Sequence, residues 1–164
     1  MQKIITYIIL LIAILFAGCK MNYSFTGASI PVGAETVSVA GFPNMAPLVN
    51  PLLSNTLTEA LKDKFMSQTS LQLVQYDGDL KFEGTIIKYN TRPMNIEAGS
   101  DQAAQNRLTI GVKVTFKNSI NPEADFENSF TRYSDYSSDR SLQDVENALV
   151  DEIVEQYLDY TTNL

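Results

Sequence analysis

The chain has 164 residues, a formal net charge of −7 at neutral pH, a single cysteine and neither histidine nor tryptophan. Without histidine or a spare cysteine, it lacks the common protein ligands of transition metals and cannot form a Ser-His or Cys-His nucleophile system. Its acidic balance also argues against a nucleic-acid partner, since nucleic-acid binding favours a basic surface.

The first nineteen residues have the pattern of an exported precursor. A largely apolar run over 4–16 is shorter than the roughly 20 residues that a membrane-spanning helix needs, and it suits a secretory signal peptide. Two small residues then precede Cys19. This resembles the lipobox of bacterial lipoproteins, with Phe16 where leucine is usual. We therefore expect residues 1–18 to be a signal peptide and Cys19 to be the site of lipid attachment.

The resemblance to lipoproteins implies an anchor of acyl chains such as palmitate. Residues 19–31 are polar and small enough to form a lipidated tether, about 40 Å long when fully extended. Lys20 follows the cysteine, whereas aspartate at that position retains some lipoproteins at the inner membrane. We therefore expect lipid anchoring at the periplasmic face of the outer membrane.

Residues 32–164 are long enough for one domain. Alternating β-branched residues predict a first strand over 36–40. Asn50 and Pro51 suit the start of a helix that ends near Gln68. Apolar residues then recur at helical spacing: Leu53, Leu57, Ala60, Leu61 and Phe65.

Four strand segments follow. The segments 71–76 and 80–90 flank Asp77-Gly78-Asp79, and an Asp-Gly pair between two apolar runs predicts a hairpin. Arg92-Pro93 should end the second segment, and 95–106 is polar enough for an exposed loop.

The segment 108–117 alternates strictly, which predicts a strand with one dry and one wet face. A turn over 118–123 and a strand over 126–133 follow. Ser141 should begin a second helix, with an apolar stripe to Leu158 and an acidic, solvated opposite face.

These elements predict an α+β fold, in which two amphipathic helices pack on one face of a four- to five-stranded, mixed and mostly antiparallel sheet. The other sheet face would be open to water or to a partner. The polar positions expected there are Lys81, Glu83, Thr85, Arg107, Lys113 and Lys117.

A set of segments in fixed order resembles the LptE-like lipopolysaccharide-assembly lipoproteins: 23–29, 42–44, 58–65, 78–84 and 106–110. This resemblance covers nearly the whole mature chain. It implies a non-catalytic protein without a cofactor that plugs and supports the outer-membrane β-barrel inserting lipopolysaccharide. It also implies contact with lipopolysaccharide itself.

Cations on the open face could meet the phosphates of lipid A through charge-assisted hydrogen bonds. The candidate lipopolysaccharide-binding residues are Lys81, Arg92, Arg107, Lys113 and Lys117. Each could instead be a solvated strand residue, with Glu83 near Lys113 as a cross-strand pair. Candidates for contact with the barrel partner are Met94, Tyr133 and Tyr136, because aromatic residues and methionine are enriched in interfaces.

Two other functions compete with this interpretation. A regulatory lipoprotein that binds a cell-wall synthase would have a similar architecture, but it usually needs a longer tether. A hydrolase would need two converging carboxylates, whereas turn formation or connection to the helix explains Asp77, Asp79, Asp135 and Asp139.

Replacing Cys19 with serine should abolish lipid attachment, because the thiol is the acceptor of the diacylglyceryl group. Intact-mass spectrometry of the membrane fraction should find an acylated chain beginning at Cys19 in the wild type and no acylated chain for Cys19→Ser. A wild-type mature chain with an unmodified thiol would contradict this assignment.

Overall fold

The computed structural model describes residues 31–94 and 105–162. The predicted signal peptide, Cys19, the predicted tether up to residue 30 and residues 95–104 of the predicted loop lie outside the described residues. The elements in chain order are β1 (Thr36–Val39), α2 (Leu53–Gln68), β2 (Gln72–Val74), β3 (Leu80–Met94), β4 (Gln105–Asn118), the 3₁₀ turn η1 (Pro122–Ala124), β5 (Phe126–Ser137) and α3 (Leu142–Thr162).

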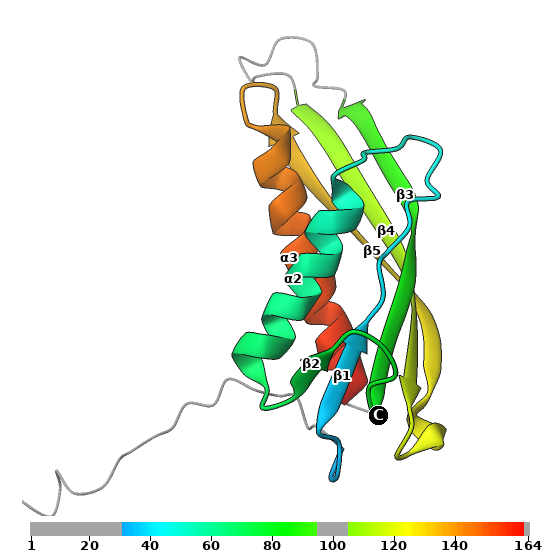
Figure 1. The fold of residues 1–164 in the computed structure, drawn as a ribbon. Helices are drawn as coiled ribbons and strands as arrows, with labels where there is room; N and C mark the ends of the chain where they lie inside the picture. The colour runs from blue at the N-terminus through cyan, green and yellow to red at the C-terminus, as the bar shows by residue number, and fades with distance from the viewer. Residues whose placement is uncertain (1–30, 95–104, 163–164) are drawn as a thin grey trace, which may run out of the picture.

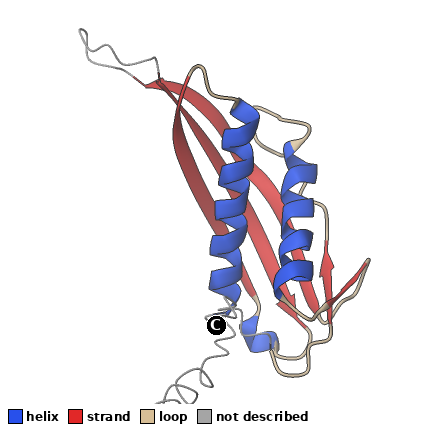
Figure 2. Ribbon diagram, turned by 90° about the vertical axis from the view of Figure 1, so that its left-hand side faces the viewer, coloured by secondary structure: helices blue, strands red, loops and turns tan. Residues whose placement is uncertain are grey.

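The strands form one five-stranded sheet in the order β2-β1-β3-β4-β5. β1 runs parallel to both β2 and β3, whereas β4 runs antiparallel to both β3 and β5. Both helices lie side by side on one face of this sheet (Figures 1 and 2). The predicted α+β architecture is therefore confirmed.

The core lies between the helices and the sheet. The strictly alternating segment forms β4, and its inward positions Leu108, Ile110 and Val112 are fully buried. Aromatic rings join the two layers: the centroid of the Phe82 ring lies 4.7 Å from that of Phe65 on α2 and 5.3 Å from that of Tyr157 on α3. The predicted apolar stripes of both helices thus face the sheet.

β3 continues beyond the predicted end at residue 90 and reaches Met94. A bulge between Ile86 and Lys88 shifts the register, so that Tyr89 rather than Lys88 turns into the core. Beyond Ile86, β3 pairs only with β4 among the described residues. Pro93 is compatible with this strand because prolines are tolerated in edge strands.

The predicted hairpin between β2 and β3 is wrong. The two strands are parallel, and β1 lies between them. Residues 75–79 therefore cross β1, so closely that a Cβ on Gly78 would lie 2.6 Å from the backbone nitrogen of Ser38. Asp77 adopts a positive φ of 51° in the same crossing. The Asp-Gly pair lies within this crossing, and β1 takes the position between the two strands.

The carboxylate of Asp79 fastens this crossing to the start of β1. Its Oδ2 accepts hydrogen bonds from the backbone nitrogens of Glu35 and Thr36, at 3.0 and 2.9 Å, and from the Thr36 hydroxyl at 2.8 Å. These donors, the Glu35 N–H first, lower the pKa of Asp79. Asp79 therefore has a structural role.

The helix starts and the last strand also differ slightly from expectation. α2 begins at Leu53 rather than at Pro51, although the Asn50 side chain still accepts the Leu52 N–H at 3.0 Å. β5 extends to Ser137, so Asp135 belongs to the sheet rather than to the connection before α3.

Asp79→Asn should lower the urea midpoint at pH 7, because hydrogen bonds to a charged acceptor are stronger than those to an amide. The pKa of Asp79 is depressed in the fold, so its contribution is fully present above the unfolded value of about 3.9. It is lost as the pH falls through the lower folded value. The urea midpoints of the wild type and of Asp79→Asn should therefore converge at acidic pH.

Asp63→Asn, an exposed change on α2, controls for the loss of one negative charge. A difference between wild type and Asp79→Asn that persists unchanged at low pH would contradict this role of the carboxylate.

Candidate functional site

The uncovered face of the sheet gathers the predicted cations in rows. The β3–β4 register places Lys81 directly opposite Lys117, and Arg92 directly opposite Arg107. We call the end near the first pair the proximal end, because the described chain begins beside it, and the end near the second pair the distal end (Figure 1). Like charges directly opposite each other are destabilising, so both pairs need compensation.

The proximal cations are each neutralised by an acidic neighbour. Lys81 pairs with Asp77 at 2.7 Å. The other two pairs are Lys113–Glu127 at 2.7 Å and Lys117–Asp125 at 2.9 Å.

The pairing of Lys113 differs from the expected one. Glu83 lies opposite Thr115 instead, and the partner of Lys113 comes from β5. The lysine lowers the pKa of Glu127, mainly through their hydrogen bond. The proximal end is therefore close to electrically balanced.

At the distal end, Arg107 is held on two sides. Its Nε and Nη2 donate to the two carboxylate oxygens of Asp135, at 2.6 and 2.7 Å. Its guanidinium carbon lies 4.2 Å from the centre of the Tyr133 ring. The hydrogen bond from Arg107 lowers the pKa of Asp135. This geometry presents a fixed, planar cation beside an exposed aromatic ring.

Arg92 adds positive charge at the same end. It is exposed, and the described residues include no ion-pair partner for it. Met94 is half-buried at the end of β3, opposite Gln105. The distal end thus combines two arginines with exposed Tyr133.

Tyr136 does not belong to this surface. It is only 9% exposed, and it faces the helices. The extension of β5 continues the alternation, so Tyr133 and Asp135 point outward while Tyr136 points inward. The Tyr136 side chain is therefore not exposed for the predicted contact with a barrel.

Lys88 is a cation of the open face that the sequence pattern missed. Simple alternation from Leu80 assigns it to the core, but the bulge at Ile87 reverses the faces, and Lys88 lies exposed opposite Gly111. A Cβ on Gly111 would lie 2.9 Å from that of Lys88. A sequence signal was present, since a glycine in a strand often marks a bulge or a close approach.

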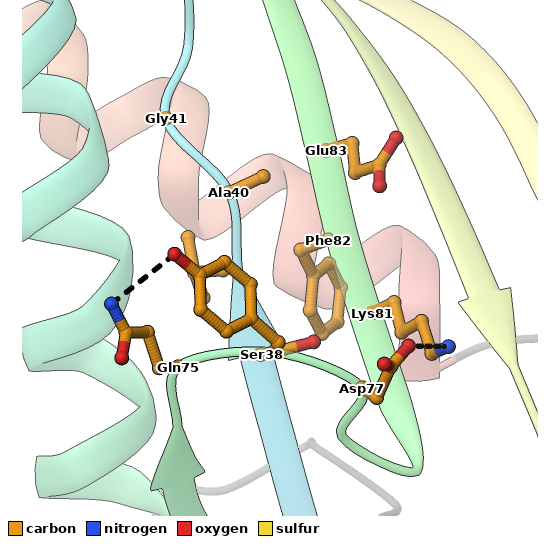
Figure 3. A pocket seen from close by; sticks show the side chains of 10 residues that line it. Ser38, Ala40, Gly41, Gln75, Asp77, Lys81, Phe82 and Glu83 are labelled. Atoms are coloured by element: carbon orange, nitrogen blue, oxygen red, sulfur yellow. Dashed lines mark hydrogen bonds and ion pairs between the residues drawn. The ribbon is translucent and has the colours of Figure 1, made fainter.

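A cleft of about 500 Å³ lies between the end of β1, residues 75–77 and the start of β3 (Figure 3). Its polar side chains already bind each other: Lys81 pairs with Asp77, and the Gln75 amide lies 3.3 Å from the Tyr76 hydroxyl. The carboxylates considered for a hydrolase all have hydrogen-bond partners in the fold: Asp77, Asp79, Asp135 and Asp139. The cleft therefore supplies no pair of free, converging carboxylates.

Within residues 31–94 and 105–162, no group of three acidic or cysteine side chains could hold a metal ion. No helix in this same part of the chain is long and apolar enough to cross a membrane.

The comparison with family models decides the family. The model described as LptE, lipopolysaccharide-assembly, matches residues 34–160, which include all the strands and helices except the end of α3. The chain belongs to the LptE family. None of the curated proteins compared with it is similar enough to match.

Solved structures of low sequence identity are similar to this LptE-family chain. A hypothetical protein, CT253 from Chlamydia trachomatis, has 10% identity and a TM-score of 0.53, covering 80% of this chain and 99% of that one. A minor lipoprotein from Acinetobacter baumannii has 11% identity and a TM-score of 0.49, covering 79% and 94%. The PelC dodecamer from Paraburkholderia phytofirmans has 11% identity and a TM-score of 0.49, covering 74% and 86%.

Truncation to alanine should change the urea midpoint of unfolding differently at Arg92 and at Arg107. Arg107→Ala leaves the Asp135 carboxylate without its partner, so it should lower the urea midpoint. Arg92→Ala removes a like charge from the opposite strand, so it should leave the midpoint unchanged or raise it slightly. Equal losses in both variants would show that Arg92 also has a structural partner.

Proposed function

We propose that this LptE-family chain is an outer-membrane lipoprotein that acts as a non-catalytic assembly factor. It would serve as plug and chaperone for the β-barrel that inserts lipopolysaccharide into the outer membrane. The family match over residues 34–160 is the observation that carries this proposal. The shape of the domain, a rigid two-layer body with one uncovered sheet face, suits contact with other molecules.

In this proposal, residues 1–18 are removed as a signal peptide and Cys19 is acylated. Residues 19–31 tether the single domain 32–164 to the periplasmic face of the outer membrane. The tether joins the fold at the proximal end. β3 has 15 residues, which at about 3.3 Å per residue carries the distal end some 45 to 50 Å away from that junction.

Lipopolysaccharide contact is assigned chiefly to the distal end. Arg92 and Lys88 are exposed and have no ion-pair partner among the described residues, so their charge is available to lipid A phosphates. Arg107 adds a planar guanidinium whose orientation Asp135 already fixes. Such cations form strong, short hydrogen bonds with phosphate oxygens.

The proximal cations Lys81, Lys113 and Lys117 are weaker candidates for the same role. Each has an acidic neighbour within 3 Å that competes with a phosphate for its charge.

Contact with the barrel is assigned to Tyr133 and Met94. Tyr133 is 58% exposed and stands beside Arg107. Tyrosine and arginine are the residue types enriched at the energetic centres of protein interfaces.

Photo-crosslinking in living cells tests the whole proposal. A photoreactive residue is placed singly at 81, 107, 113 or 133. Positions 107 and 133 should form adducts to an outer-membrane barrel or to lipopolysaccharide, and positions 81 and 113 should form fewer. Positions 81 and 113 serve as matched controls, because their native lysines are similarly placed on the face but are neutralised.

Adducts with a periplasmic cell-wall synthase instead would favour the regulatory-lipoprotein alternative. A depletion strain that still delivered lipopolysaccharide normally to the cell surface would overturn the proposed function.

A further inference from the structure

The loop between β1 and α2 displays apolar side chains to solvent. Met45, Leu48, Val49 and Leu52 are 72, 55, 56 and 63% exposed. No charged residue occurs between Glu35 and Glu59, so the loop stands in the middle of a long uncharged stretch. We call residues 45–52 the apolar loop. In Figure 1 it lies toward the distal end, between β3 and the start of α2.

The apolar loop is built to hold its shape. Prolines at 43, 47 and 51 restrict the backbone at regular spacing. Ile86 of β3 fixes the entry to the loop, because its N–H donates to Pro43 at 2.9 Å and its carbonyl accepts from Met45 at 2.8 Å. The Asn44 side chain spans the loop, donating to the Asn50 carbonyl at 3.1 Å.

A buried carboxylate holds the other end of the apolar loop. Glu146 of α3 is 2% exposed, and its two oxygens lie 3.0 and 2.9 Å from the Asn50 amide nitrogen, which donates to them. The hydroxyl of Tyr89 on β3 donates to the same carboxylate. Burial, together with that carboxylate, raises the pKa of Tyr89, so it stays protonated and remains a donor. The loop is therefore clamped to β3 and α3, and its exposed side chains are preorganised.

The side chains of the apolar loop are better suited to contact with hydrocarbon than to contact with a protein surface. Its exposed side chains are aliphatic, whereas energetic hot spots of protein interfaces are rich in tryptophan, tyrosine and arginine and poor in leucine and valine. The interior of an outer-membrane barrel is polar, which does not match such a loop. Acyl chains do match it, because apolar surface is favourable only against an apolar environment.

A cation lies on the open face of β3, two residues beyond the strand position that holds the apolar loop. Lys88 is two residues beyond Ile86, to which the loop is hydrogen bonded, and two residues of a strand span about 7 Å. Lys88 is exposed, and Arg92 follows it on the same face. An apolar surface with unpaired cations beside it is complementary to a lipid that carries both acyl chains and phosphate.

We propose that the apolar loop receives acyl chains of a phosphorylated, multiply acylated lipid, with Lys88 facing its headgroup phosphate. This rests on the proposed function, since the lipid class is that of the lipopolysaccharide to be inserted. The described chain begins at the opposite, proximal end of the domain, so this proposal makes the lipid at the loop the cargo and not the anchoring bilayer.

The absence of tryptophan from the chain provides a clean test. Val49→Trp places a probe on the apolar loop, and Met66→Trp places a control on α2, where the native side chain is also 56% exposed. The full chain is reconstituted in phosphatidylcholine nanodiscs, with or without added lipid A. The emission of Val49→Trp should shift to the blue with lipid A present, and that of Met66→Trp should not.

Three results would overturn the proposal. The first is no blue shift of the emission at position 49 when lipid A is added, and the second is equal blue shifts at positions 49 and 66. The third is an emission at position 49 that is already blue-shifted in nanodiscs without lipid A. Lys88→Ala in the Val49→Trp background should require roughly tenfold more lipid A for the same shift, as expected for loss of one charge-assisted hydrogen bond. An unchanged lipid A requirement would overturn the assignment of the headgroup to Lys88.

Failure of this inference is distinguishable from failure of the proposed function. Position 107 could crosslink to the barrel or to lipopolysaccharide while the emission at position 49 shows no blue shift. That result would support the proposed function and overturn the assignment of acyl chains to the apolar loop. Circular dichroism of both tryptophan variants verifies that the fold is intact.

Discussion

The register of the β3–β4 ladder fixes which side chains are buried and which are presented. Side chains in a strand alternate between faces, so a slip of one residue would exchange the apolar and polar sets. With the observed pairing, Phe82 lies opposite Phe116 inside the core, while Lys81 lies opposite Lys117 outside it. The same constraint that builds the core therefore also builds the rows of cations on the open face.

The two ends of the open face differ because their acidic neighbours differ. Proximally, the crossing after β2 and the strand β5 supply carboxylates, so that Lys81 and Lys113 are both neutralised. Distally, Asp135 pairs with Arg107 and leaves the charge of Arg92 and Lys88 uncompensated among the described residues. A surface with a neutral end and a positive end gives an anionic ligand a preferred position on an otherwise acidic molecule.

Hydrogen-bonded carboxylates hold two connections of the fold in place. Asp79 fastens the crossing of β1, and Glu146 fastens the end of the apolar loop through Asn50. The buried carboxylate of Glu146 would be costly without its hydrogen bonds. Asp79 is only half-buried, and it accepts three hydrogen bonds. The apolar loop is consequently held to β3 and α3 by hydrogen bonds at both of its ends.

Local patterns in the sequence were sufficient to predict the fold class, because hydrophobic alternation and helical spacing report directly on which faces are buried. Leu108, Ile110 and Val112 are buried as predicted, and Leu57 and Leu149 face the core from the two helices. The order of the segments was also sufficient to indicate the family that residues 34–160 match. These properties depend on neighbours a few residues away.

The tertiary structure decided everything that depends on distant partners. The Asp77-Gly78 turn predicted a hairpin, but the insertion of β1 between β2 and β3 is a long-range pairing that no local signal specifies. The bulge after Ile86 moved Lys88 to the open face. The partners Asp135 for Arg107 and Glu146 for Asn50 come from segments far along the chain, so only the folded arrangement shows which cations keep their charge free and which loop is held rigid.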